Sequence, residues 1–175
     1  IIYDTMWNST RRMAECIAEG LRETDPTLTV KLFNSAVDDK NDIVTEVFKS
    51  KAILVGSPTI NYGFLFSIGG IMEMIRGLKF KNKKAAAFGS YGWSGEAVKQ
   101  ITALLQGAGF DVVNDGLRCQ WNPDQATQET CRQYGRDFAA AVNASEAKED
   151  EVQTELGDYN NDEQIGKAAK EHFED

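Results

Sequence analysis

The sequence contains a single histidine and only three cysteines among its 175 residues. Cys16, Cys119 and Cys131 lie far apart and form no Cys-x-x-Cys pair, which argues against a metal cage, a thioredoxin-like pair and a disulfide framework. We interpret all three as packing residues in a protein of a reducing compartment. Because His172 lies in the C-terminal tail, mechanisms that require a histidine base are also disfavoured.

Long apolar runs and basic stripes are missing as well. No segment approaches the roughly 18 consecutive apolar residues of a membrane span, and no cluster of Lys and Arg suggests nucleic-acid binding. We find no leader-like pattern and expect a cytoplasmic protein. Because the chain begins with Ile1, inside an apolar segment and without a methionine, we expect it to be a piece of a longer polypeptide.

Acidic side chains are concentrated at one end of the chain. Residues 143–175 contain eleven acidic and three basic side chains, whereas residues 1–142 contain sixteen of each sign. The tail is poor in apolar residues, so we expect an acidic linker or tail at 143–175, with a possible short closing helix from Asp162. The folded domain is expected at residues 1–142.

Apolar segments alternate with amphipathic helical patterns along this domain. Segment 52–56 is apolar throughout, as in a strand that is covered on both faces, and Ile43, Val47 and Phe48 are expected on one helix face. The alternation predicts an α/β fold, a doubly wound five-stranded parallel sheet with helices on both faces. The strands are expected at 1–4, 28–33, 52–56, 84–89 and from Gly109, and the helices from about Thr10 and at 41–49, 64–76, 95–106 and 123–142.

The loop after the first strand, Thr-Met-Trp-Asn-Ser-Thr at residues 5–10, carries three hydroxyls directly before a helix. In such sheets ligands bind beyond the carboxyl ends of the strands, and the free amides of a helix N-terminus favour a phosphate. No Lys or Arg precedes Arg11, and no Gly-x-x-x-x-Gly-Lys or Gly-x-Gly-x-x-Gly pattern occurs, which favours a monophosphate held by neutral donors. Ordinary helix capping by Ser9 or Thr10 is the alternative.

The loop after the third strand reads Ser-Pro-Thr-Ile-Asn-Tyr-Gly at residues 57–63. Pro58 fixes a backbone angle and Gly63 permits a turn, so we expect a rigid arch. A rigid arch suits a planar heterocycle, with Asn61 and Tyr62 beside the ring.

The loop after the fourth strand places Tyr91 and Trp93 among the glycines Gly89, Gly92 and Gly95. These glycines allow the backbone to approach a flat ligand while an aromatic side chain stacks on it. We therefore expect the two aromatics to sandwich a flavin. The alternative is that they seal the top of the core.

The three loop sequences, in this order and spacing, resemble the flavodoxin-like domain of the flavodiiron proteins, a family that includes flavorubredoxin and rubredoxin:oxygen oxidoreductase. The resemblance covers residues 1–142 and implies a flavodoxin-like fold with FMN as cofactor. It implies that the first loop holds the phosphate and that the other two enclose the ring and ribityl chain. The expected FMN-binding residues are Thr5, Met6, Trp7, Asn8, Ser9, Thr10, Pro58, Thr59, Ile60, Asn61, Tyr62, Ser90, Tyr91, Gly92, Trp93, Ser94 and Gly95.

The resemblance also implies an electron-transfer function. Flavodiiron proteins carry a metallo-β-lactamase-like domain whose two irons reduce oxygen or nitric oxide. That ligand set is missing here, so we expect the diiron domain upstream of Ile1 and neither a metal site nor a catalytic residue in this chain. The chain would relay electrons from an external reductase or rubredoxin, through FMN, to the diiron site of a parent protein that is a homodimer or higher oligomer.

Two alternatives stay open. A free-standing flavodoxin-type electron carrier would share the fold and FMN, but such carriers usually display acidic residues around the flavin, and residues 1–142 are neutral overall. A receiver-like or interaction domain without a cofactor would need clustered acidic residues at strand ends, where only Asp4 lies.

Overall fold

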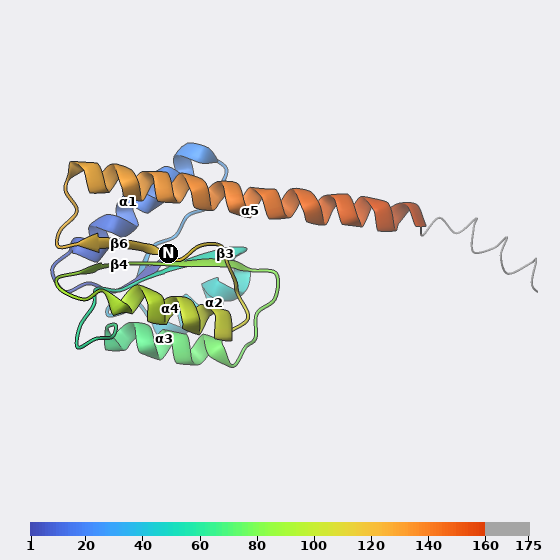
Figure 1. Ribbon diagram of the computed structural model, residues 1–175. Helices are drawn as coiled ribbons and strands as arrows, with labels where there is room; N and C mark the ends of the chain where they lie inside the picture. The colour runs from blue at the N-terminus through green and yellow to red at the C-terminus, as the bar shows by residue number, and fades with distance from the viewer. Residues whose placement is uncertain (160–175) are drawn as a thin grey trace, which may run out of the picture. The chain divides into compact units, whose positions relative to one another are not determined.

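The computed structural model describes the backbone of residues 1–159 and the side chains of residues 1–144. The chain divides into two units, 1–140 and 141–175, and the first contains the whole sheet (Figure 1). The closing helix expected from Asp162 lies outside the described residues. The elements are β1 (Ile2–Tyr3), α1 (Ser9–Thr24), β2 (Phe33–Asn34), α2 (Lys40–Lys49), β3 (Ala52–Gly56), α3 (Phe66–Arg76), β4 (Lys84–Tyr91), α4 (Glu96–Gly107), β5 (Asp111–Val112), β6 (Leu117–Gln120) and α5 (Gln125–Tyr159).

The strands form one parallel sheet in the order β2-β1-β3-β4-β5, with β6 also paired to β4. Helix α1 and the first part of α5 cover one face, and α2, α3 and α4 cover the other (Figure 1). This arrangement confirms the doubly wound α/β fold. Because β1 lies between β2 and β3, the winding reverses beside β1, where a ligand site is expected.

The last strand is interrupted, which the sequence reading did not anticipate. Strand β5 pairs with the beginning of β4, and β6 pairs with residues Phe88 to Tyr91 at its end. Between them, Gly116 adopts a left-handed conformation with φ 89°, and a Cβ there would lie 2.4 Å from Val98. Strand β6 therefore carries the chain back to the carboxyl edge of the sheet.

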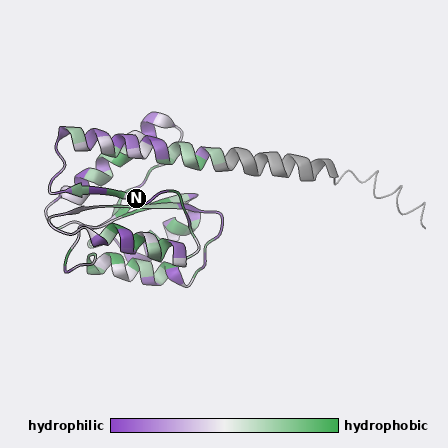
Figure 2. Ribbon diagram, viewed as in Figure 1, coloured by the Kyte–Doolittle hydropathy of each residue, from purple (hydrophilic) through white to green (hydrophobic). Residues whose placement is uncertain are grey.

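Hydrophobic residues run along the sheet and in bands on the helices (Figure 2). The residues Ala85 to Phe88 of β4 are completely buried, as expected for a strand covered on both faces. The expectation for α2 is wrong in one position, because Phe48 is 55% exposed whereas Ile43 and Val47 are buried. Successive helical residues are about 100° apart, so Phe48 lies beyond the stripe that Ile43 and Val47 share.

Helices α1 and α5 approach each other very closely within the first unit. A Cβ on Gly20 would lie 2.0 Å from the backbone oxygen of Arg132, so the contact requires glycine. Ion pairs flank this contact, with N–O distances of 2.8 Å from Arg132 to Glu19 and 2.6 Å from Arg136 to Glu23. The first part of α5 is thereby fixed on the domain.

Helix α5 continues to Tyr159, although we expected it to end at Val142. Residues 146–155 contain four Glu together with one Ala, one Lys and one Gln, all of high helix propensity, and the beginning of the acidic tail is helical. None of the helices described is both long enough and apolar enough to cross a membrane.

Cys16, Cys119 and Cys131 are buried free thiols in the described part of the chain. Burial raises the pKa of all three, and it raises the pKa of Cys131 to about 12. A thiol with a raised pKa stays protonated and unreactive at neutral pH, which agrees with a packing role.

Candidate cofactor-binding site

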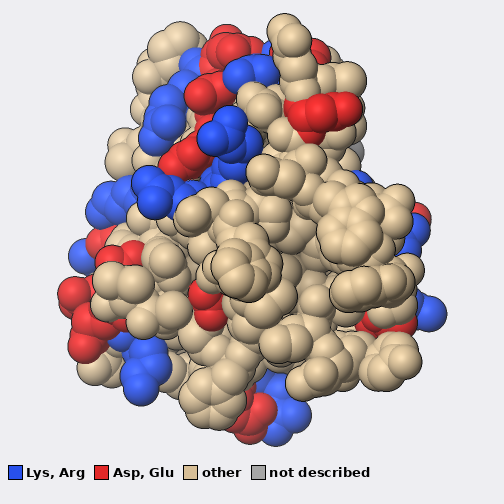
Figure 3. All heavy atoms as spheres, turned by 90° about the vertical axis from the view of Figure 1, so that its left-hand side faces the viewer, with Lys and Arg blue, Asp and Glu red and all other residues tan. Residues whose placement is uncertain are grey.

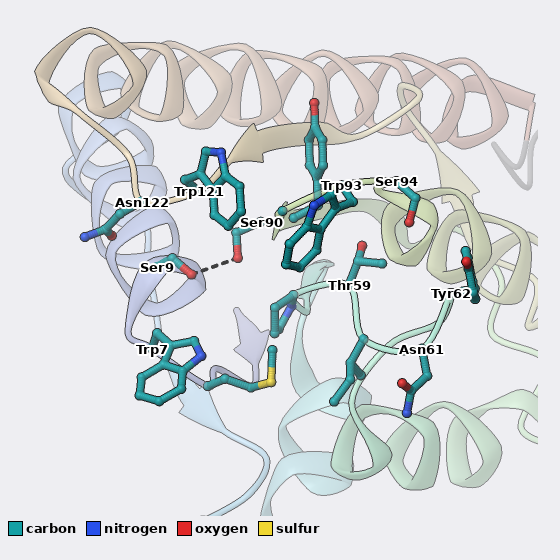
Figure 4. A pocket seen from close by; sticks show the side chains of 15 residues that line it. Trp7, Ser9, Thr59, Asn61, Tyr62, Ser90, Trp93, Ser94, Trp121 and Asn122 are labelled. Carbon is teal, nitrogen blue, oxygen red and sulfur yellow. Dashed lines mark hydrogen bonds between the residues drawn. The ribbon is translucent and has the colours of Figure 1, made fainter.

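A cavity of about 870 Å³ lies between the loops at the carboxyl ends of β1, β3, β4 and β6 (Figure 4). Its volume falls in the range typical of sites for small molecules and cofactors. Among the described residues that line it, none is Lys, Arg, Asp, Glu or His. The lining residues are Met6, Trp7, Ser9, Pro58, Thr59, Ile60, Asn61, Tyr62, Ser90, Tyr91, Gly92, Trp93, Ser94, Trp121 and Asn122.

The structure brings together most of the residues that the sequence singled out. Thirteen of the seventeen predicted residues line the cavity. Thr5, Asn8, Thr10 and Gly95 do not line it but lie in the same loops or directly after them. That these residues contact FMN stays a prediction.

Hydroxyl groups from β4 and α1 meet at one end of the cavity. The Oγ of Ser90 lies 2.8 Å from Ser9 Oγ and 3.0 Å from Thr10 Oγ1, and Figure 4 marks the first of these bonds. Thr10 is completely buried. Because Ser9 and Thr10 bond to Ser90 instead of helix amides, the structure does not support the alternative of ordinary capping.

The backbone amides at this end are available to a ligand. Within residues 1–144, no protein acceptor receives the N–H groups of residues 6–11. Asn8, the residue before α1, has φ 62°, and its side chain caps none of these amides. Helix N-termini with free amides bind phosphate groups, and they supply partial positive charge without a Lys or Arg.

A buried carboxylate lies under the same loop. Asp4 is 7% exposed and accepts a hydrogen bond from the N–H of Thr5 at 2.6 Å and another from the hydroxyl of Ser67. The hydroxyl of Ser67 in turn lies 2.8 Å from that of Ser35, so the loops after β1 and β2 are tied to the first turn of α3. The Oγ1 of Thr5 is buried and has no hydrogen-bond partner among the described residues. Free amides, neutral hydroxyls and this orphaned hydroxyl fit a phosphate monoester.

The loop after β3 forms one wall of the cavity. Ile60 and Gly63 exchange two backbone hydrogen bonds, of 3.0 and 2.8 Å, around a two-residue turn. Asn61 and Tyr62 both have positive φ, 48° and 59°, as in a type I′ turn. The sequence reading assigned the turn to Gly63, but Gly63 is not left-handed. The turn is therefore strained at Tyr62, because bulky residues rarely adopt positive φ.

The loop after β4 forms the facing wall. Trp93 is 88% exposed and stands over the cavity in Figure 4, so it does not plug the core. The ring of Tyr91 lies against Gly95, which has φ 79°. The role expected for Gly89 is wrong: a Cβ there would lie 2.0 Å from the backbone oxygen of Ser57, so this glycine serves the close approach of β3 and β4.

Trp121 and Asn122, at the end of β6, were missed by the sequence reading. The indole of Trp121 lies 5.4 Å from that of Trp93, edge to face, and packs beside Gly92. The backbone N–H of Trp121 donates to the backbone oxygen of Tyr91 at 2.8 Å. The rule that ligands bind at the carboxyl ends of strands would have found both residues if the interrupted last strand had been recognised.

Exposed aromatic side chains surround the cavity on a surface with little charge. Figure 3 shows the face at the carboxyl ends of the strands, where charged residues gather toward the top and the lower left and the centre is largely uncharged. Large exposed apolar side chains gathered around a cavity indicate a site of interaction. We call this surface the rim; its members are Met6, Trp7, Tyr62, Trp93 and Trp121, all of which are exposed and line the cavity.

Residues 1–135 match the flavodoxin family. The chain belongs to this family. FMN is the cofactor of flavodoxins, which confirms the expected cofactor, and the neutral phosphate-type end and aromatic walls of the cavity fit it.

Similar proteins agree with the resemblance to flavodiiron proteins. The chain is 51% identical, over 139 residues, to the anaerobic nitric oxide reductase flavorubredoxin of Escherichia coli O1:K1, covering 79% of this chain and 29% of that protein. Rubredoxin oxygen:oxidoreductase of Desulfovibrio gigas superposes with a TM-score of 0.79 at 37% identity, covering 83% of this chain and 36% of that one. The flavodiiron protein of Giardia intestinalis gives a TM-score of 0.78 at 29% identity, with coverage of 84% and 36%. The chain thus spans about 29% of the length of the curated relatives it matches.

Proposed function

We propose that this chain is the FMN-binding electron-transfer module of a flavodiiron-type oxygen or nitric oxide reductase. The observation that carries the proposal is the cavity, which has free amides and hydroxyls at one end and exposed indoles around it. The 51% identity to flavorubredoxin supports the flavodiiron type over other flavodoxins.

The residues of the chain bind, orient and shield the cofactor. The amides of residues 6–11, with Ser9, Thr10 and Ser90, would hold the phosphate, while Trp93 and the turn at residues 60–63 would flank the ring. FMN, when bound, supplies the redox chemistry. No side chain of the cavity is a carboxylate, a thiol or an imidazole, so we assign no acid–base catalyst to this chain.

The electron acceptor would lie outside this chain. A diiron, metallo-β-lactamase-like domain upstream of Ile1 in the parent protein would receive the electrons, and an external reductase or rubredoxin would supply them. Residues 1–142 would be the FMN domain and residues 143–175 an acidic tail. The parent would be a cytoplasmic homodimer or higher oligomer. Support comes from the flavodiiron relatives, which are about three times longer than the matched region.

A free-standing flavodoxin-type carrier is the alternative. Such carriers attract basic partners with acidic side chains around the flavin, and charge steering of this kind accelerates encounter. The rim of this chain is aromatic and largely uncharged. A neutral apolar rim suits a permanent neighbour within one protein better than a succession of charged partners.

The test has two parts. The purified chain is expected to be yellow or to take up FMN stoichiometrically from solution, as measured by absorbance and fluorescence titration. The photoreduced, FMN-loaded chain is then mixed with a separately expressed diiron domain of a flavodiiron relative, and its reoxidation under oxygen or nitric oxide is followed.

The diiron domain is expected to accelerate reoxidation, and the same domain with its metal removed is the control. Equal reoxidation rates with the metal-loaded and metal-free domains would reject electron transfer to a diiron site and favour the free-standing flavodoxin-type carrier. Failure to bind any flavin would reject both.

A further inference from the structure

The turn at residues 60–63 is held by a side chain from outside its loop. The backbone oxygen of Tyr62 accepts a hydrogen bond of 2.7 Å from Nε2 of Gln100, on α4. In the described part of the chain this is the one bond that fixes the Tyr62 carbonyl. The peptide that follows Tyr62 is therefore anchored to α4.

Helix α4 makes a second contact with the same loop. The N–H of Ala97 donates to the hydroxyl oxygen of Thr59 at 3.3 Å. Residues 97 and 100 are three positions apart and lie on one face of the helix. The first turns of α4 thus hold the wall of the cavity at two points, before and within the strained turn.

We propose that Gln100 is a positioning residue for the flavin ring, which keeps Asn61 and Tyr62 in their left-handed conformations on the cavity wall. The inference rests on the proposed binding of FMN in this cavity. Gln100 does not line the cavity itself, so it acts through the backbone of Tyr62.

The physical reason is the conformation of Tyr62. Its φ of 59° is disfavoured for a bulky residue, whereas asparagine at 61 tolerates positive φ more readily. Tyr62 is also 76% exposed, so no core packing compensates for the strain. A hydrogen bond to its carbonyl stabilises the left-handed state relative to extended alternatives. Without that bond, the wall would spend time in conformations that a flat ring does not fit.

The first experiment compares Gln100→Ala with wild type by titration with FMN and with riboflavin. We expect both dissociation constants to rise by about threefold to tenfold, which corresponds to the loss of one hydrogen bond. Because the turn lies on the ring side, the ratio of the two constants should stay unchanged. Gln106→Ala, another exposed glutamine of α4, is the matched control and should leave both constants unchanged.

Gln100→Glu separates hydrogen bonding from packing. Glutamate has the same length and shape, but the ionised carboxylate accepts hydrogen bonds and cannot donate one to a carbonyl. The proposal requires this variant to behave like Gln100→Ala. Wild-type affinity in Gln100→Glu would overturn it.

Tyr62→Gly tests the strain directly. Glycine adopts positive φ without steric cost, so the hydrogen bond from Gln100 is no longer needed to hold residue 62 in its left-handed conformation. In the Tyr62→Gly background, Gln100→Ala should weaken flavin binding by less than about twofold, a coupling that additive contributions would not produce. An undiminished effect in that background would show that Gln100 acts elsewhere.

A measurement without flavin distinguishes failure of this inference from failure of the proposed function. The Gly63 amide, which donates to Ile60 across the turn, should exchange with solvent about threefold to tenfold faster in flavin-free Gln100→Ala than in wild type. An unchanged exchange rate of the Gly63 amide would show that Gln100 does not hold the turn, even in a protein that binds no flavin. Faster exchange of this amide in a protein that binds no flavin would show that Gln100 holds the turn and would reject the FMN site.

Discussion

Where α1 crosses the first turns of α5, polar groups are paired and the backbone is regular. Gly20 lies against the Arg132 carbonyl, ion pairs flank the contact, and buried thiols remain protonated. At the carboxyl edge of the sheet the pattern is reversed. Amides lack acceptors in the described protein, indoles are exposed, and Asn8, Tyr62 and Trp121 have positive φ.

This difference separates stability from ligand binding within one small domain. Local rules are obeyed where two helices must pack and are broken where a ligand must be received, as expected for functional sites. Substitutions in the helix contact should therefore change the free energy of unfolding. Substitutions at the carboxyl edge should change flavin affinity more than the free energy of unfolding of the flavin-free protein.

The largest effect is expected from Gly20→Ala. The added methyl group would lie 2.0 Å from the backbone oxygen of Arg132, so α5 must move. We expect the free energy of unfolding to fall by about 3 kcal/mol, the upper part of the range for overpacking. Urea denaturation of the flavin-free protein measures it.

Gly70→Ala in α3 is the matched control for that substitution. A Cβ at Gly70 meets nothing within 4 Å, so the higher helix propensity of alanine should raise the stability by up to about 1 kcal/mol. Equal responses at the two glycines would contradict the close contact of α1 and α5.

The next largest effect is expected from Ser9→Ala, at the hydroxyl end of the cavity. Loss of a hydrogen bond to a charged phosphate costs about 1.5–3 kcal/mol, so the FMN dissociation constant should rise about tenfold to hundredfold. Riboflavin lacks the phosphate, and its affinity should not change. An equal loss of affinity for FMN and for riboflavin in Ser9→Ala would show that the phosphate does not bind at Ser9.

Trp93→Ala should weaken FMN and riboflavin equally, because the indole faces the ring side of the cavity. Stacking on an aromatic side chain contributes about 1–3 kcal/mol, and we expect an affinity loss near tenfold for both ligands. Fluorescence titration provides the measurement, with Trp93→Phe as the variant that retains a ring. Unchanged affinity in Trp93→Ala would remove this residue from the site.

The smallest effect is a pH dependence in the helix-covered interior. The pKa of the Cys131 thiol is about 12 in the folded protein, against an ordinary value of 9.0. Above pH 9 the unfolded chain loses this proton while the folded chain keeps it, so stability falls as pH rises toward 12. Between about pH 9 and about pH 10 the expected loss is on the order of 1 kcal/mol.

Urea denaturation at both pH values measures that loss, and the Cys131→Ala variant should show a correspondingly flatter profile. Identical profiles for the variant and wild type would contradict the raised pKa. Flavin affinity should not follow this titration, because Cys131 does not line the cavity.

The sheet and three of the four cavity loops could be predicted from the sequence. Apolar runs, separated by segments with apolar residues at helical spacing, locate the central strands. Strand β3 at Ala52–Gly56 has the predicted bounds. Parallel strands place their carboxyl ends at one edge, so the loops after β1, β3 and β4 had to converge. This convergence explains why Ser9, Thr59 and Trp93 line the same cavity.

Features that depend on tertiary context could not be predicted in the same way. Trp121 became part of the site through the break between β5 and β6, which no periodicity marks. The left-handed conformation of Tyr62 contradicts the local preference of tyrosine and depends on a bond from α4. The pattern also predicted that Phe48 would be on the buried face of α2 and that α5 would end at Val142. Phe48 is instead exposed, and α5 continues to Tyr159.

The bonds among Ser9, Thr10 and Ser90 bear on when the cofactor enters. These three hydroxyls already bond to one another in the protein alone, whereas the amides of residues 6–11 and the Thr5 hydroxyl have no partner among the described residues. Arrival of the nucleotide is then an exchange of partners within a finished scaffold. The hydroxyls of Ser9, Thr10 and Ser90 are therefore held in place before the nucleotide arrives, and binding exchanges their partners without having to order them.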